Sequence, residues 1–254
     1  MKSKGLNKSV LQIIAVIAML IDHIWLIDKM WYISNPWIYT LMNIIGAVTV
    51  VIMSYFVAEG YHKTTNLGKY ITRMAVFAAI SQIPYYFATN GLTITGNFNG
   101  LVVSMFYNRN VIFTLFVGLC LLTVLKSSYN ILIKLIAIIA ALWLAKYSDW
   151  SYYALLWIIG FGLFHGDKRK QMLWLAAVIL IRLIITAIAP IIGIINNGSL
   201  NLLVLCNWIS TFGCFLAIPL LASYNGERGN AHKWTFYVIY PLQFIIIILL
   251  NVIL

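Results

Sequence analysis

The sequence predicts an all-α, polytopic transmembrane helical bundle of about nine spans, with its N-terminus in the cytoplasm. Of the 254 residues, 63% are hydrophobic and only 9% are charged, and the mean hydropathy of +0.93 is far above that of water-soluble domains. Apolar stretches that can cross a hydrocarbon core of about 30 Å recur from end to end. We therefore expect a single integral membrane domain, residues 1–254, spanning a bacterial plasma membrane several times.

The spans are placed by hydropathy and by helix-breaking residues. The first apolar stretch continues for about 18 residues after Lys8 without a cleavage pattern, so we expect a retained span and not a signal peptide. Pro84 removes a backbone donor and is expected to open the third helix. The expected ranges are 9–27, 37–57, 70–89, 110–125, 131–147, 151–165, 171–190, 200–222 and 235–254.

The basic residues predict the orientation of these spans. With the N-terminus inside, most of the 17 Lys and Arg residues fall on the cytoplasmic side, and only Lys29, Arg109 and Lys146 fall outside. Arg182 lies within the seventh span. This asymmetry follows the positive-inside rule and accounts for most of the net charge of +11. We therefore expect the lipid bilayer as a partner and no nucleic acid.

The cysteines and the longest outer connection offer little chemistry. Cys120, Cys206 and Cys214 all lie in apolar ranges without metal-site spacing, so we expect free thiols and no metal. The connection 90–109 is rich in Gly and Asn but keeps the apolar core LVVSMF. It is either a re-entrant segment that covers a cavity or a loop that rests on the membrane surface.

Asp22 and His23 are adjacent ionisable residues inside the first span. Such residues are costly in a membrane and usually mark a functional interior, so both are candidates. Because adjacent positions differ by about 100° around a helix, we expect the two side chains to face different neighbours. The structural alternative is that Asp22 pairs with Arg182 and that His23 only joins two helices.

Further candidate residues lie near both predicted membrane faces. On the cytoplasmic side, two segments could meet a phosphorylated donor, although a basic loop obeying the positive-inside rule would look similar. These segments carry Glu59, His62, Lys63, Lys69 and Arg73 in one case, and Arg228, His232 and Lys233 in the other. On the outer side, Asn110 begins the fourth span and Thr114 lies one turn deeper.

Short sequence blocks are spread over most of the chain: MLIDHI at 19–24, EGYHKT at 59–64, KYxxR at 69–73, SxIP at 81–84, NVxFTL at 110–115, YNGxRG at 224–229, Lys233, and FYxxYP at 236–241. In this order, the blocks resemble the TraX family of membrane proteins. The chain departs from the family pattern in two places. Ala47 and Met53-Ser54 stand where an arginine or similar polar residue and a Phe-Pro pair are expected, and Gln243 stands where a histidine is expected.

The resemblance implies a membrane acyltransferase that moves acetyl from cytoplasmic acetyl-CoA to an acceptor at the outer side. The acceptor would be the N-terminal amine of pilin, another secreted peptide or a small molecule. On this hypothesis His23 is the general base, Asp22 orients partners or stabilises the imidazolium, and Asn110 or Thr114 donates to the developing oxyanion. The residues assigned to acetyl-CoA binding are Glu59, His62, Lys69, Arg73, Arg228 and Lys233.

Two other classes of function stay open at this point. Asp22, His23 and Arg182 would form a proton or ion relay in a transporter, although the paired halves typical of transporters are not evident. A noncatalytic scaffold for envelope assembly is the third reading, and Gln243 keeps it open because the family's histidine is replaced there.

Overall fold

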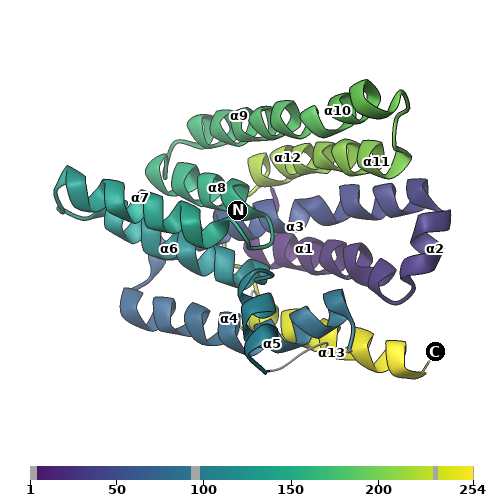
Figure 1. The fold of residues 1–254 in the computed structure, drawn as a ribbon. Helices are drawn as coiled ribbons and strands as arrows, with labels where there is room; N and C mark the ends of the chain where they lie inside the picture. The colour runs from purple at the N-terminus through teal and green to yellow at the C-terminus, as the bar shows by residue number, and fades with distance from the viewer. Residues whose placement is uncertain (1–4, 93–97, 231–233, 254) are drawn as a thin grey trace. The chain divides into compact units, whose positions relative to one another are not determined.

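The computed structural model of the chain describes residues 5–92, 98–230 and 234–253, and within these ranges it contains helices and no β-strand (Figure 1). The expected all-α class is confirmed. The helices are α1 (Lys8–His23), η1 (Ile24–Leu26), α2 (Lys29–Ser34), α3 (Pro36–Lys63), α4 (Leu67–Asn90), α5 (Phe98–Phe106), α6 (Val111–Lys126), α7 (Ile131–Ala145), α8 (Ser151–Leu163), α9 (Lys168–Thr186), α10 (Ile188–Asn197), α11 (Leu202–Ser210), η2 (Thr211–Leu216), α12 (Ala217–Ala222) and α13 (Thr235–Ile253).

Each of the nine ranges expected from hydropathy falls on a helix or on a run of consecutive helices. Three of these, α6, α7 and α8, are apolar but shorter, with 16, 15 and 13 residues. At 1.5 Å per residue they measure about 20–24 Å, less than the hydrocarbon core. Within the described residues, five helical segments are long and apolar enough to cross a membrane: Lys8–Leu26, Pro36–Lys63, Lys168–Asn196, Leu202–Ala222 and Thr235–Ile253.

The chain divides into two compact units. The first unit contains residues 1–52 and 172–235, and the second contains residues 53–171 and 236–254. The boundaries fall inside α3, near the start of α9 and after the first residue of α13, so each of these helices contributes residues to both units. Each unit is described by itself below.

In the first unit, α1 packs against the first part of α3. The hydroxyl of Thr49 on α3 donates a hydrogen bond of 2.8 Å to the carbonyl of Ala15 on α1. Gly213 in η2 lies against the backbone of Ile44, so close that a side chain at position 213 would overlap it. The indole of Trp208 near the end of α11 donates to the carbonyl of Leu183 near the end of α9 at 3.0 Å, which joins these two helix ends.

The start of the chain is tied to the loop that follows α12. The amide of Leu6 donates to the carbonyl of Ser223, and the amide of Asn225 donates back to the carbonyl of Leu6, both at 2.9 Å. The amide of Lys8 donates to the carbonyl of Glu227 at 2.9 Å, and the side chain of Asn7 caps α1. The start of α1 and the end of α12 therefore lie at the same end of this unit.

In the second unit, α6 is the central helix and packs against α4, α7 and α8 (Figure 1). The α6–α8 contact depends on two glycines. A β-carbon at Gly118 would come within 2.5 Å of the Ile158 side chain, and one at Gly162 would come within 2.5 Å of the Leu122 side chain. Each glycine therefore accommodates a large apolar residue of the other helix, which allows close packing.

Two predictions, for Pro84 and for the connection 90–109, can be compared with the structure of the second unit. α4 continues through Pro84 from Leu67 to Asn90, so the proline does not end the helix. In the expected connection 90–109, residues 98–106 form α5, and residues 93–97 lie outside the described part of the chain. The side chain of Gln82 on α4 donates to the carbonyls of Met105 and Asn108, which anchors the end of α5.

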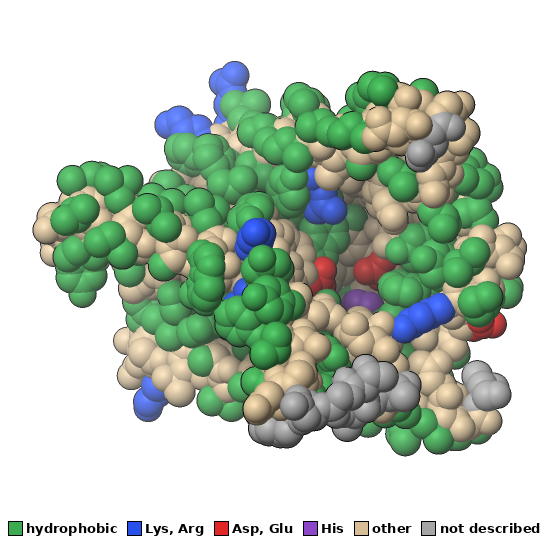
Figure 2. Space-filling model, in the orientation of Figure 1, with side chains coloured by type: hydrophobic (Ala, Val, Ile, Leu, Met, Phe, Trp, Pro, Cys, Tyr) green, Lys and Arg blue, Asp and Glu red, His purple; other side chains and the backbone are tan. Residues whose placement is uncertain are grey.

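The described surface is largely apolar. Hydrophobic side chains cover most of the face in the space-filling view (Figure 2). On α7, exposed side chains follow one another along the helix, among them Ile131, Ile139 and Trp143. Such a surface suits contact with lipid. The three cysteines are free thiols, as expected.

Candidate functional site

His23 is the last residue of α1 in the first unit and is partly buried. Its Nδ1 lies 2.8 Å from the carbonyl oxygen of Met19, one turn earlier on the same helix. Because a carbonyl only accepts hydrogen bonds, Nδ1 must carry the proton in this contact. In the neutral ring, Nε2 is then the nitrogen with the lone pair, which is the form that a general base requires.

Asp22 faces a different neighbour from His23, as the helical offset predicts. Its carboxyl group lies against the α-carbon of Gly46 on α3, where any side chain would overlap it. Asp22 also interacts electrostatically with Tyr39. The α1–α3 contact therefore holds the carboxylate beside a glycine.

Three aromatic rings gather beyond this point, where α1 turns through α2 into α3. The ring centroids of Trp25 and Tyr32 are 5.2 Å apart, those of Trp25 and Tyr39 are 5.5 Å apart, and those of Tyr32 and Tyr39 are 4.3 Å apart. No sequence motif indicated this group of rings. The only signal for it was the general enrichment of Trp and Tyr at membrane interfaces.

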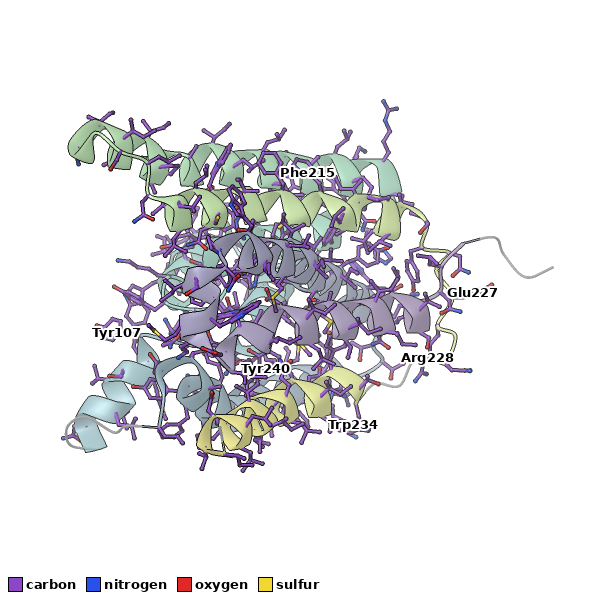
Figure 3. The ribbon with its side chains drawn as sticks, turned by 90° about the vertical axis from the view of Figure 1, so that its right-hand side faces the viewer. Tyr107, Phe215, Glu227, Arg228, Trp234 and Tyr240 are labelled. Carbon is purple, nitrogen blue, oxygen red and sulfur yellow. The ribbon has the colours of Figure 1, made fainter. Side chains whose placement is uncertain are left out.

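Two arginines of the first unit had predicted roles: Arg182 as a partner of Asp22, and Arg228 in binding the donor. Arg182 lies on α9 and interacts electrostatically with Cys214. Its expected pairing with Asp22 stays a prediction. Arg228 is exposed on the loop after α12, and both Glu227 and Arg228 lie outside the helices (Figure 3). Lys233 lies outside the described residues.

In the second unit, Glu59 is buried near the end of α3 and has a cationic partner. Its carboxylate is only 6% exposed and lies 2.8 Å from the Nζ of Lys63, one turn later on the same helix. From the sequence, Glu59 was expected to take part in binding the donor. The spacing of four residues was the available signal for this intrahelical pair.

His62, on the adjacent turn, contacts the last turn of α8 and the loop that follows it. Its Nε2 lies 2.9 Å from the carbonyl oxygen of Gly162, and its ring stacks on that of His165 with centroids 3.9 Å apart. Partial burial, together with the neighbouring His62 ring, lowers the pKa of the His165 imidazole. No sequence pattern indicated His165, because it lies about a hundred positions away from its partner.

Lys69 and Arg73, on the first turns of α4, differ in what surrounds them. Lys69 is exposed. The guanidinium carbon of Arg73 lies 5.2 Å from the ring centroid of Tyr70 and 5.5 Å from that of Tyr237 on α13. These cation–π contacts give Arg73 a role in joining α4 to α13, whether or not it also contacts a ligand.

Asn110 belongs to a hydrogen-bond network between α4 and α6. Its side-chain amide donates to the carbonyl of Ala78 and to Oε1 of Gln82, both at 2.8 Å, while its Oδ1 caps α6 by accepting from the amide of Phe113. Both amide hydrogens are therefore used within the protein. This geometry supports a structural role, and donation to an oxyanion stays a prediction.

Thr114 and the residues around it complete this network. The hydroxyl of Thr114 donates to the main-chain carbonyl of Asp149 at 2.8 Å, and the amide of Val111 donates to the hydroxyl of Tyr240 at 3.3 Å. Gln243 follows Tyr240 by one turn of α13 and is 4% exposed. Neither polar atom of its side chain has a hydrogen-bond partner among the described residues.

Comparison with known proteins places the chain in a family. Residues 7–251 match the TraX protein family. The chain belongs to the TraX family. The sequence is also 25% identical over 237 residues to the probable fimbrial assembly protein FimC, serogroup H1, of Dichelobacter nodosus, with 92% of this chain and 91% of that protein covered. No solved structure matches it.

In this TraX chain the predicted site residues fall into three groups. Asp22, His23 and Arg228 belong to the first unit. In the second unit, one group comprises Glu59 and His62 at the end of α3 with Lys69 and Arg73 at the start of α4, and another comprises Asn110 and Thr114 at the beginning of α6. The described residues contain no cluster of three or more His, Cys, Asp or Glu side chains that could hold a metal ion.

Proposed function

We propose that this TraX chain is a membrane acetyltransferase that takes acetyl from cytoplasmic acetyl-CoA and transfers it to an acceptor at the outer side. His23 is the general base. The observation that carries this proposal is the 2.8 Å contact between His23 Nδ1 and the Met19 carbonyl, which leaves Nε2 as the basic nitrogen of the neutral ring. The similarity to a probable fimbrial assembly protein supports pilin, or another secreted peptide, as the acceptor.

The proposed topology has nine spans with the N-terminus inside. It is supported by the agreement between the nine hydropathy ranges and the helices. It is also supported by hydrogen bonds that join segments expected on one face. The Leu6 main chain pairs with Ser223 and Asn225, both expected inside, and the Arg109 main chain pairs with Tyr147 and Asp149, both expected outside. The short helices α6, α7 and α8 fit this arrangement if the membrane is locally thin or their ends lie within the protein.

The donor is recognised through its phosphates on the cytoplasmic side. In the first unit, Arg228 is exposed on a loop that main-chain hydrogen bonds fix to the start of the chain. An exposed guanidinium on an anchored loop suits bidentate binding of a phosphate. In the second unit, the exposed ammonium of Lys69 offers a point charge for the same purpose.

The transfer step needs one base. Nε2 of His23 accepts a proton from the acceptor amine as the amine nitrogen forms its bond to the acetyl carbonyl carbon. The C–S bond of the thioester breaks, and the proton passes from the imidazolium to the departing thiolate, which leaves as the free thiol of CoA. Asp22 on the same helix favours the imidazolium formed in between by its negative charge. Atoms and charge balance without any further reactant.

The proposal is tested with the purified full-length chain, acetyl-CoA carrying a labelled acetyl group, and a peptide with a free N-terminal amine. The expected result is labelled peptide and one equivalent of free CoA thiol per acetyl transferred. In a second measurement, CoA should raise the melting temperature of the chain, because a ligand that binds only the folded state stabilises it. Stabilisation should be weaker in Arg228→Ala. Ion flux into proteoliposomes without acetyl-CoA, and no CoA binding, would instead indicate a transporter.

A noncatalytic role in assembly is the second candidate, and the similarity to a probable fimbrial assembly protein favours it. On that account the chain binds a secreted subunit without modifying it. Capture of such a subunit by a chain that neither binds CoA nor releases its thiol would establish this role and overturn the acetyltransferase proposal.

A further inference from the structure

Arg109 carries the most conspicuous unsatisfied charge in the described part of the second unit. Its side chain is only 5% exposed, and none of its three guanidinium nitrogens has a hydrogen-bond partner among the described residues. No described carboxylate forms an ion pair with it. A buried cation whose donors are all unmet is costly, and such groups usually mark a binding site.

The aromatic neighbours of Arg109 explain its position only in part. The guanidinium carbon lies 4.4 Å from the ring centroid of Phe106 on α5 and 4.8 Å from that of Phe113 on α6. Ring faces attract the cation, and the attraction is stronger where water is excluded. The five N–H bonds of a guanidinium, however, point outward in its plane and need acceptor oxygens that ring carbons do not provide.

The surrounding backbone adds to the positive field. Arg109 immediately precedes Asn110, the N-cap of α6, so the guanidinium lies near the positive end of that helix. The main chain of Arg109 is fixed on both sides, because its amide donates to the carbonyl of Tyr147 at 3.0 Å and its carbonyl accepts from the amide of Asp149 at 2.8 Å. The carboxylate of Asp149 interacts electrostatically with Tyr85 and Tyr240. The cation is therefore held in place beside a helix N-terminus.

We propose that Arg109 is the binding residue for a phosphate group at the N-terminal end of α6. The two non-bridging oxygens of a phosphate accept paired N–H bonds from one guanidinium edge, and its ester oxygens are further, weaker acceptors for the remaining nitrogen, whereas a carboxylate has only two oxygens. The group enters from the side of Phe106, whose ring is 39% exposed. Because Val102 and Val103 on the same helix are also exposed and apolar, the phosphate of a membrane lipid can approach without leaving the bilayer. The site is independent of His23 and of acetyl transfer.

The test measures the melting temperature of the full-length chain in detergent after removal of native lipid. The additives are phosphatidylglycerol, phosphatidylcholine and inorganic phosphate, each added separately. Arg109→Gln is compared with wild type and with Lys146→Gln, which removes an exposed cation from the neighbouring loop. Native mass spectrometry counts the bound lipid. Phosphatidylglycerol should stabilise wild type and Lys146→Gln by several degrees, and its dissociation constant should rise at least tenfold in Arg109→Gln.

The other outcomes are equally decisive. If inorganic phosphate alone gives the full stabilisation and loses it in Arg109→Gln, the site stands and its phosphate comes from solution. If Arg109→Gln does not fold, Arg109→Lys keeps the charge but not the planar fork, and its affinity should fall by a smaller factor. Equal stabilisation of wild type and of the folded Arg109 variants by every additive, or no stabilisation of wild type, overturns the proposal.

Discussion

The carboxyl group of Asp22 lies directly against the α-carbon of Gly46, and this contact joins α1 to α3 beside the proposed base. A glycine at this position lets the two helices approach while an acidic side chain stays between them. Asp22 and Gly46 therefore have to be considered together. The position of His23, the next residue on α1, depends on the same contact.

Gly46→Ala should destabilise the chain by about 1–3 kcal/mol, because the added methyl group would displace Asp22 or separate the helices. Gly193→Ala is the matched control. Gly193 also lies in a helix of the first unit, but an added β-carbon there meets no atom within 4 Å. The control should be neutral or slightly stabilised, since alanine favours helix. Thermal unfolding of both variants measures the difference, and equal melting temperatures would refute the close contact.

Asn110→Ala should cost about 2–4 kcal/mol, because it removes a helix cap and two further hydrogen bonds to α4. Asn130→Ala is the control, since Asn130 caps α7 through a single exposed hydrogen bond and should cost only about 1 kcal/mol. The comparison is made by unfolding in increasing denaturant. A loss of acetyl transfer in Asn110→Ala without loss of stability would instead favour its role as an oxyanion donor.

Lys63→Met should lower stability by about 1–2 kcal/mol, because the buried carboxylate of Glu59 loses its partner at 2.8 Å. The effect is limited because the Lys63 side chain is 55% exposed. Lys69→Met, a change of the same kind at an exposed lysine, should have little effect. The double variant Lys63→Met with Glu59→Gln should recover much of the loss. If it does not, the ion pair is not the source of the effect.

The stacked imidazoles of His62 and His165 should make stability depend on pH. Because partial burial and His62 lower the pKa of His165, the unfolded chain binds more protons than the folded chain just below pH 6.5, the ordinary histidine value. This contribution to stability is complete above that pH and declines as the pH falls. Glu59 opposes the shift, while Lys63 and Lys126 add to it. Melting temperatures of wild type and His165→Asn between pH 5 and 8 should converge at low pH, and parallel curves would exclude the effect.

Much of the fold was predictable because apolar length and helix breakers are local properties of a sequence. All nine expected ranges fall on helices, and α4 continues through Pro84, where an opening of the helix was expected. Family membership followed from short blocks such as those at 19–24 and 59–64. Hydropathy did not predict two features: the short helix α5 in the connection 90–109, and the 3-10 segment η2 between α11 and α12.

The site was less predictable, because side-chain partners depend on contacts between distant segments. Asp22 and His23 stood out as ionisable residues in a span, but the contact of Asp22 with Gly46 could not be read from either residue alone. His62 and His165 meet only in the folded chain. By contrast, the spacing of four residues between Glu59 and Lys63 was enough to predict their ion pair. The sequence-based prediction for Glu59 was instead a role in ligand binding.

The central claim is that Nε2 of His23 acts as the general base, and His23→Asn tests it most directly. The amide nitrogen of asparagine can replace Nδ1 in the contact with Met19, but the side chain provides no basic nitrogen. In the purified, folded variant, the rate of acetyl transfer from labelled acetyl-CoA to a peptide amine should fall at least about 100-fold while CoA binding is unchanged. Transfer at close to the wild-type rate would contradict the account.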